Sequence, residues 1–244
     1  MVSDKSAKSG LFKKMLKIVF GIFFSLSLVI FLWQTIWKMS GSNQWELIRQ
    51  EQGIEVYSLK APGSSLKQIR AKVRVKASMA SIVSFFQDQS TCPEFGCLEA
   101  EIIEQVSPQL YYSSFKYPLP FNLGVREFVV KSVYYQDPVN KEVHYYHTAA
   151  PEMKPLDDCC FRVTDFYVLW RFTPVGKGEV ELEMKRDFDL GGFMPDLLLN
   201  QNFPGGAYNL LARLQGFLDR EKYQGAAFDF IREPASEVSL SPGS

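Results

Sequence analysis

The segment FMPDLLLNQNFPGGAYNLLARLQGFLDREKY, residues 193–223, marks the point where strand-like patterning gives way to a helical pattern. Its apolar residues recur at spacings of three and four, which places them on one face of a helix. These residues are Ala207, Leu210, Leu211, Leu214, Phe217 and Leu218. The string Phe203-Pro204-Gly205-Gly206 is expected to divide the helix in two, because proline removes a backbone donor and glycine weakens helical propensity. A helix with one apolar face needs a surface to cover.

The segments before this helix supply such a surface. In residues 68–76, Ile69, Ala71, Val73 and Val75 alternate with polar residues, which is typical of a strand with one wet face. Further strands are expected at 54–60, 98–106, 110–116, 126–135, 142–148, 162–172 and 180–189, with a short helix over 45–52 and a second one from the N-cap Ser78 through Gln89. The predicted fold class is α+β, an antiparallel sheet covered by the C-terminal helix.

An apolar N-terminal segment precedes this domain. Residues 18–37 carry no charge and are long enough, at about 1.5 Å per residue, to span a hydrocarbon layer of about 30 Å. Lysines are more frequent before the segment than after it, so the positive-inside rule predicts a cytoplasmic basic N-terminus, residues 1–17, and a domain on the periplasmic or lumenal side. We expect a single-pass transmembrane anchor, with a signal peptide cleaved near Ser40-Gly41-Ser42 as the alternative.

The remaining boundaries follow from composition. A linker is expected over residues 38–44, and its part from Met39 to Gln44 reaches only about 20 Å, which keeps the domain beside its own bilayer. The domain is expected over residues 45–226. Residues 227–244 are expected to form a disordered tail, because the end of the chain is rich in Ser, Pro, Glu and Gly.

Charge and motifs exclude several function classes. The 27 basic residues balance 27 acidic ones and form no basic stripe, so a nucleic-acid partner is not expected. The sequence contains no Gly-x-Ser-x-Gly elbow, no phosphate loop and no dinucleotide fingerprint. His144 and His147 are three residues apart, which on a strand places them on opposite faces and makes them poor partners in a metal site. No catalytic residue, metal or cofactor is predicted.

The cysteines leave their pairing open. Cys92 and Cys97 could close a small loop in an exported domain, although spacing alone does not show that the geometry permits it. The adjacent Cys159 and Cys160 are more awkward to bridge.

Alternation places one charged residue on an apolar strand face. Arg126 shares a side of its predicted strand with Phe128 and Tyr134. A buried arginine is costly unless a carboxylate satisfies it, so Arg126 with Glu99 or Glu101 is a candidate internal pair. The alternative is an ordinary salt bridge at the end of a strand.

The loop at residues 117–124, YPLPFNLG, is apolar and contains two prolines, so it is no regular central strand. It either plugs one end of the core or forms a gate that touches lipid.

Several strings, in their order along the chain, resemble the StAR-related lipid transfer (START) family. They cover most of residues 45–223, and they are weak singly but fairly specific together. They are Trp45, Val56-Tyr57, Gly63-Ser64-Ser65-Leu66-Lys67 with Ile69-Arg70-Ala71, Pro118-Leu119-Pro120 with Arg126-Glu127-Phe128-Val129, and Asp189-Leu190-Gly191-Gly192-Phe193-Met194-Pro195 with Asn200.

The resemblance implies a helix-grip fold, in which a curved antiparallel sheet wraps a long C-terminal helix around a lipid-sized tunnel. It implies that Arg126 points into the tunnel with Glu99 as its acidic partner, although Glu127 stands where the family usually has Asp, and Gly205-Gly206 puts a single rigid lid in doubt. The predicted ligand-binding residues are Arg126, Glu99, Glu101, Phe128, Tyr134 and Met184. The predicted gate residues are Tyr117, Leu119, Phe121, Leu123, Leu210, Leu211 and Leu214.

The function expected from this resemblance is non-catalytic. The domain would bind a lipid such as a sterol or phospholipid and present or transfer it near the membrane, to a soluble carrier or a neighbouring membrane. Arg126→Ala would then abolish ligand retention and leave the fold intact. The alternatives are a helix-grip enzyme of cyclase or hydrolase type acting on an apolar substrate, and a lipid sensor that recruits a partner protein.

Overall fold

The computed structural model describes residues 3–119, 123–192 and 196–234, which divide into two compact units. One unit consists of the described residues through Gln44 together with Lys60–Ser65. The other consists of Trp45–Leu59 and the described residues from Leu66 onward.

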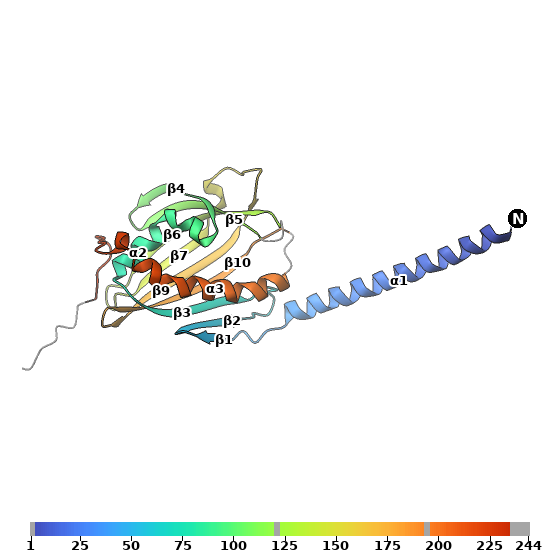
Figure 1. The fold of residues 1–244 in the computed structure, drawn as a ribbon, viewed down its shortest axis with the longest axis horizontal. Coiled ribbons are helices and arrows are strands. Elements are labelled where there is room, and N and C mark those ends of the chain that lie inside the picture. Colours follow the sequence, from blue (N-terminus) through green and yellow to red (C-terminus); the bar gives the residue numbers. More distant parts are fainter. Residues whose placement is uncertain (1–2, 120–122, 193–195, 235–244) are drawn as a thin grey trace, which may run out of the picture. The chain divides into compact units, whose positions relative to one another are not determined.

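The first unit is built on a single long helix, α1 (Ser3–Met39) (Figure 1). Its part from Lys14 to Met39 has a mean hydropathy of 2.5 and no buried side chains, so it is long and apolar enough to cross a membrane. This part contains the predicted anchor, residues 18–37. Beyond the helix end, the ammonium of Lys60 donates to the carbonyl of Ser40 at 2.9 Å, and a cation is favourable near a helix C-terminus.

The second unit contains one mainly antiparallel sheet, to which the described residues contribute ten strands (Figure 1). The strands run in the order β1-β2-β3-β10-β9-β7-β6-β5-β4, with β8 added in parallel beside β6. Their bounds are β1 Trp45–Glu51, β2 Ile54–Leu59, β3 Gln68–Lys76, β4 Leu98–Ser107, β5 Leu110–Pro118, β6 Val125–Gln136, β7 Val143–Ala149, β8 Phe161–Arg162, β9 Asp165–Gly176 and β10 Glu179–Asp189. The eight predicted strands are confirmed in position to within a few residues, whereas β1 and β8 were not predicted as strands.

The helix expected over residues 45–52 is wrong, because this segment is the edge strand β1. It pairs with β2 through a two-residue turn, since Glu51 lies opposite Ile54. Both turn residues, Gln52 and Gly53, have positive φ angles of 51° and 75°, as in the tight turns that favour hairpins. The hairpin turn therefore decides the structure of a segment whose own pattern is ambiguous.

Two helices cover one face of the sheet. The first, α2 (Met79–Gln87), begins at the predicted N-cap, where the Ser78 side chain accepts a hydrogen bond from the Ser81 amide at 3.0 Å. The second, α3 (Asp196–Leu218), packs on α2 through Phe85 and Phe217, whose ring centroids are 5.4 Å apart. Short 3-10 helices lie at η1 (Gln89–Phe95), η3 (Pro151–Met153) and η4 (Glu221–Tyr223).

The expected division of the C-terminal helix at residues 203–206 is wrong, since α3 is continuous through Pro204. Packing explains the difference. Ala207, Leu211 and Leu214 are almost completely buried, and Phe203 lies 5.0 Å from the ring of Phe188. Burial of several such side chains stabilises the helix by more than the roughly 3 kcal/mol that a proline costs in a helix interior.

The tail expected to be disordered from residue 227 is instead packed as far as the structure describes it, to residue 234. Ile231 is buried, and the carboxylate of Glu233 accepts hydrogen bonds from the amides of Met79 and Ala80 at 3.0 and 2.8 Å. These amides belong to the first turn of α2, where a carboxylate satisfies free donors. Residues 235–244 lie outside the described part.

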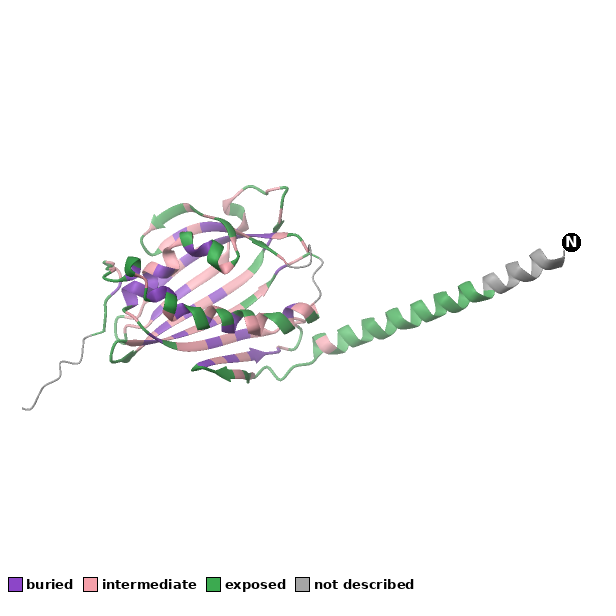
Figure 2. Cartoon of the chain, viewed as in Figure 1, coloured by how far each residue is buried: buried purple, intermediate pink, exposed green. Residues whose placement is uncertain are grey.

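Buried residues lie on α2, on α3 and on the strands of the sheet (Figure 2). Their side chains form two clusters. The larger cluster joins α2 and the C-terminal half of α3 to the sheet face beneath them, which we call the inner face. The smaller cluster consists of Phe128, Val130, Val163, Leu190 and Leu199.

Candidate functional site

The inner face of the sheet carries polar side chains at the same level on successive strands. Arg186 on β10 lies opposite Val168 on β9, and Val168 lies opposite His147 on β7. His147 in turn lies opposite Ser132 on β6, which lies opposite Tyr111 on β5. Residues in register on neighbouring strands face the same side of a sheet. We call Arg186, His147, Ser132 and Tyr111 the polar row.

Three members of the polar row form an uncharged end. The Ser132 hydroxyl and His147 Nδ1 are 3.0 Å apart, and the hydroxyls of Tyr111 and Tyr145 are hydrogen-bonded. Burial lowers the pKa of His147 to about 3, so its imidazole is neutral at neutral pH. Burial also raises the pKa of Tyr111 and keeps its phenol protonated.

The fourth member, Arg186, is a cation with few partners. Its Nη2 donates to the backbone carbonyl of Phe203, and its guanidinium carbon lies 5.0 Å from the Phe203 ring and 5.7 Å from the Phe188 ring. Its Nε is buried and has no hydrogen-bond partner among the described residues. Burial lowers the pKa of Arg186 to about 10, which still leaves the side chain charged at neutral pH.

Five phenylalanine rings lead across the inner face to Arg186, and we call them the phenylalanine chain. Phe115 and Phe128 stack at 4.8 Å, and Phe166 lies 5.3 Å from Phe128. Phe188 lies 5.4 Å from Phe166 and 5.0 Å from Phe203 on α3. All except Phe128 are only half-buried although they face the interior. A fully packed interior would remove that accessible surface.

Arg126, the predicted ligand-binding cation, is buried but not paired as expected. Its Nε donates to the carbonyl of Leu190 at 2.8 Å, its Nη1 to Leu123 at 3.0 Å and its Nη2 to Gly191 at 3.1 Å. Desolvation lowers the pKa of Arg126. The side chain therefore connects the end of the predicted gate loop to the turn after β10, and any role toward a ligand stays a prediction.

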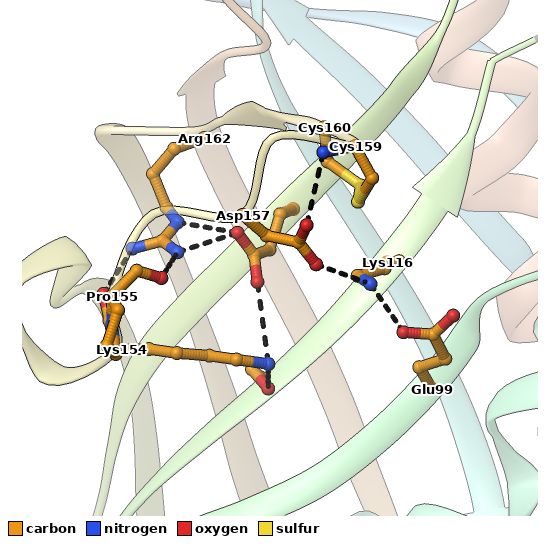
Figure 3. The surroundings of a disulfide bond; sticks show 10 residues. Glu99, Lys116, Lys154, Pro155, Asp157, Cys159, Cys160 and Arg162 are labelled. Carbon is orange, nitrogen blue, oxygen red and sulfur yellow. Dashed lines mark hydrogen bonds and ion pairs between the residues drawn. A yellow bond between two sulfur atoms is a disulfide. The ribbon is translucent and has the colours of Figure 1, made fainter.

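The predicted pairing of Arg126 with Glu99 or Glu101 is wrong. Both acids lie on β4, an edge strand of the sheet, and their side chains are 66% and 56% exposed. Glu99 pairs with Lys116 at 2.5 Å (Figure 3). Glu101 pairs with Lys154 at 2.8 Å. The strand pattern showed neither the position of β4 at the edge of the sheet nor the register shift between Leu98 and Glu101.

A buried ion pair does exist next to Arg126, on the opposite face of β6. Glu127 is 1% exposed and accepts two hydrogen bonds from the guanidinium of Arg162, at 2.9 and 2.7 Å. The remaining Arg162 donors reach the carbonyls of Lys154 and Pro155 at 2.9 and 2.7 Å (Figure 3). One of them also reaches the carbonyl of Pro151 at 2.6 Å. This network fixes the segment before β8 and lies away from the inner face.

The other predicted ligand-binding residues lie inside. Tyr134 and Met184 are buried in the larger cluster. They lie at the same level of the sheet, because Tyr134 is opposite Tyr145, Tyr145 is opposite Trp170, and Trp170 is opposite Met184. Phe128 belongs to the smaller cluster. Their contact with a ligand remains a prediction.

The predicted gate residues divide into three groups. Leu211 and Leu214 are core residues of α3, with Leu210 packed at their margin. Leu119 and Leu123 are half-buried at the two ends of the loop, whereas Tyr117 is 40% exposed. Phe121 lies outside the described residues. Their role as a gate stays a prediction.

Both cysteine pairs are joined. Cys92 and Cys97 form a disulfide around η1, as the sequence allowed. Cys159 and Cys160 are bonded to each other despite being adjacent, in the loop next to Asp157 and Lys116 (Figure 3).

Sequence reasoning missed Arg186, although a signal for it was present. Val180, Leu182 and Met184 alternate inward on β10, and continuing the same parity places Arg186 and then Phe188 on the inner face. The polar row as a whole depends on the register of five strands, which no single strand reveals.

Comparisons with known proteins agree with this architecture. No family model matches the chain. An uncharacterized protein of Pseudomonas aeruginosa is 24% identical over 181 residues, which cover 73% of this chain and 89% of that protein.

Two solved structures illustrate the fold. A STAR-related lipid transfer protein fragment from Xanthomonas axonopodis superposes with a TM-score of 0.65 at 22% identity, over 72% of this chain and 99% of that one. Human StAR-related lipid transfer protein 5 gives a TM-score of 0.60 at 16% identity, over 81% and 97% of the two chains. From Trp45 onward, the described chain has the helix-grip fold of the StAR-related lipid transfer domains.

Proposed function

We propose that this chain binds a lipid between the sheet and α3, without catalysis, and presents or transfers it close to the membrane that holds α1. The phenylalanine chain carries this proposal, because four of its five rings face the interior and are only half-buried. An apolar ligand beside the rings would cover that surface and gain about 25 cal/mol per Å². The fold supports the same reading, since both solved relatives bear lipid transfer in their names.

The polar groups of the interior support binding more than chemistry. His147 is bonded to Ser132, but its pKa of about 3 makes it a weak base at neutral pH. A general base works best when its pKa lies near the working pH. The pair is therefore better suited to hydrogen-bonding a ligand than to activating a nucleophile.

The N-terminal helix supports a role at a membrane. Residues 18–37 would form the anchor, with residues 1–17 in the cytoplasm and the domain on the periplasmic or lumenal side. Only residues 40–44 separate the end of α1 from β1, so the domain would work within a few nanometres of its own bilayer. This short reach favours delivery to a soluble carrier or a neighbouring membrane.

Photo-crosslinking in the native membrane tests the proposal. Cells that express the full chain are fed a fatty acid with a diazirine in its tail and an alkyne handle, irradiated, and the labelled peptides of the purified chain are mapped. We expect adducts on β9, β10 and α3 in addition to α1. Adducts confined to α1 would contradict an internal lipid site, because α1 contacts bulk lipid in any case.

A further inference from the structure

The two arginines that extend from the inner-face side of β6 and β10 have different surroundings. Arg126 donates from three nitrogens to three backbone carbonyls, so its charge is well solvated by the protein. Arg186 donates to one carbonyl, that of Phe203, and its buried Nε has no partner in the described part of the chain. The ion pairs of the described residues include none with Arg186.

The described residues give the guanidinium of Arg186 too few hydrogen-bond acceptors for a structural role alone to account for it. A guanidinium has five N–H donors, and a buried charge without an acid or enough acceptors is costly. The rings of Phe188 and Phe203 offer cation–π contacts at 5.7 and 5.0 Å, which replace only part of the lost hydration. The unpaired Nε therefore points to an acceptor that the described residues do not supply.

The surroundings define the chemistry of that acceptor. A guanidinium binds carboxylate and phosphate oxygens through two parallel hydrogen bonds, and such charge-assisted bonds are stronger in an apolar interior. The phenylalanine chain ends at Phe188 and Phe203, the two rings beside Arg186. A molecule with an anionic head at Arg186 would lay its apolar tail directly along the half-buried rings.

We propose that Arg186 is the head-group site of the lipid cavity and selects an amphiphile whose head carries an anionic oxygen, either a carboxylate or a phosphate. This inference rests on the proposed lipid-binding function and specifies its ligand class. The uncharged remainder of the polar row, His147, Ser132 and Tyr111, provides no second cation for the head.

The test compares probes that differ only in the head. The full chain is reconstituted in phosphatidylcholine vesicles with one of three photoactivatable lipids of identical tail: a fatty acid, its methyl ester, and a monoalkyl phosphate. The readout is the yield of crosslinks on β9, β10 and α3, measured by peptide mapping. Arg186→Met is compared with Arg171→Met, a control on the next strand whose side chain is 39% exposed and pairs with Glu183 at 2.8 Å.

In the wild-type chain, at least one of the two acids should label these elements about tenfold or more above the methyl ester. A factor of about ten is the effect on binding expected from one charge-assisted hydrogen bond. Which acid is preferred distinguishes a carboxylate from a phosphate head. Arg186→Met should reduce labelling by the acids to the level of the ester, and Arg171→Met should leave it unchanged.

Two results would overturn the inference. Equal labelling by the acids and the ester in the wild type would contradict selection of the head group by its charge, although the lipid-binding proposal would still stand. This comparison uses the wild-type chain alone and so does not depend on whether a variant folds. Undiminished labelling of Arg186→Met by the acids assigns the selection to another residue. If no probe labels β9, β10 or α3, both the inference and the proposed function are wrong.

Discussion

Arg126 and Glu127, neighbours on β6, point to opposite faces of the sheet and are satisfied there in different ways. Arg126 donates hydrogen bonds to the carbonyls of Leu123, Leu190 and Gly191, whereas Glu127 accepts hydrogen bonds from the guanidinium of Arg162. The sequence identifies Arg126 as a charge on an apolar strand face and Glu127 only as a departure from the pattern of the family that it resembles. It does not identify their partners, because Leu190, Gly191 and Arg162 are distant in the chain and lie in short segments with no periodic pattern.

The buried pair of Glu127 and Arg162 makes a large contribution to stability. Glu127→Gln leaves a buried guanidinium without its carboxylate, and we expect the free energy of unfolding to fall by about 3 kcal/mol. Denaturation of the full chain in vesicles, followed by tryptophan fluorescence, measures the change. Glu94→Gln, which breaks the exposed pair with Arg220, is the control and should have a much smaller effect. Equal losses in the two variants would contradict the assigned role.

His147 makes stability depend on pH. Its pKa is lowered from 6.5 to about 3 in the folded chain, so the unfolded chain binds one more proton between these values. Stability should therefore rise with pH from about 3 to 6.5, with a slope of up to about 1.4 kcal/mol per pH unit from this residue, and level off above. Unfolding at several pH values measures the slope. A His147→Gln variant should lose this part of the slope, and an unchanged profile would show that His147 is not buried in its neutral form.

At the scale of elements, the periodic patterns predicted the strands of the sheet and α2 well. They failed where a turn or tertiary packing decides the outcome. The turn Gln52-Gly53 converts a segment of mixed pattern into β1, and packing of Ala207 and Leu211 keeps α3 continuous past Pro204. The partners of Glu99 and Glu101 were also mispredicted, because the position of β4 at the edge depends on the order of the whole sheet.

The glycines of α3 and of the turn before it should respond to substitution in opposite ways. A Cβ on Gly205 would meet no atom within 4 Å, so Gly205→Ala should stabilise the helix by about 1 kcal/mol. Gly191 has a φ of +62°, and a Cβ there would lie 2.4 Å from the ring of Phe161. Gly191→Ala should therefore destabilise the domain.

Thermal unfolding of the two variants in the same vesicles measures this contrast. A destabilised Gly205→Ala would show that α3 needs flexibility at this position, which contradicts a continuous helix. A Gly191→Ala variant as stable as the wild type would contradict the close approach of Phe161.

At the scale of the whole molecule, the predicted orientation places the domain outside the cytoplasm. Such compartments permit disulfides, and the four cysteines form two of them, Cys92 with Cys97 and Cys159 with Cys160. Denatured chain from isolated membranes should therefore take up no maleimide before reduction and four afterwards. Uptake before reduction, with thiols blocked at lysis, would indicate a reducing compartment and the opposite orientation.

Whether the domain itself carries a lipid can be measured once the domain has been separated from the anchor. A specific protease site inserted in the linker, residues 40–44, allows the full chain to fold in its membrane and the domain to be released by cleavage. Native mass spectrometry of the released domain, followed by lipid extraction, then identifies what it holds. We predict one anionic lipid per domain, lost on unfolding. A released domain with the mass of the polypeptide alone, obtained from lipid-replete membranes, would contradict the account.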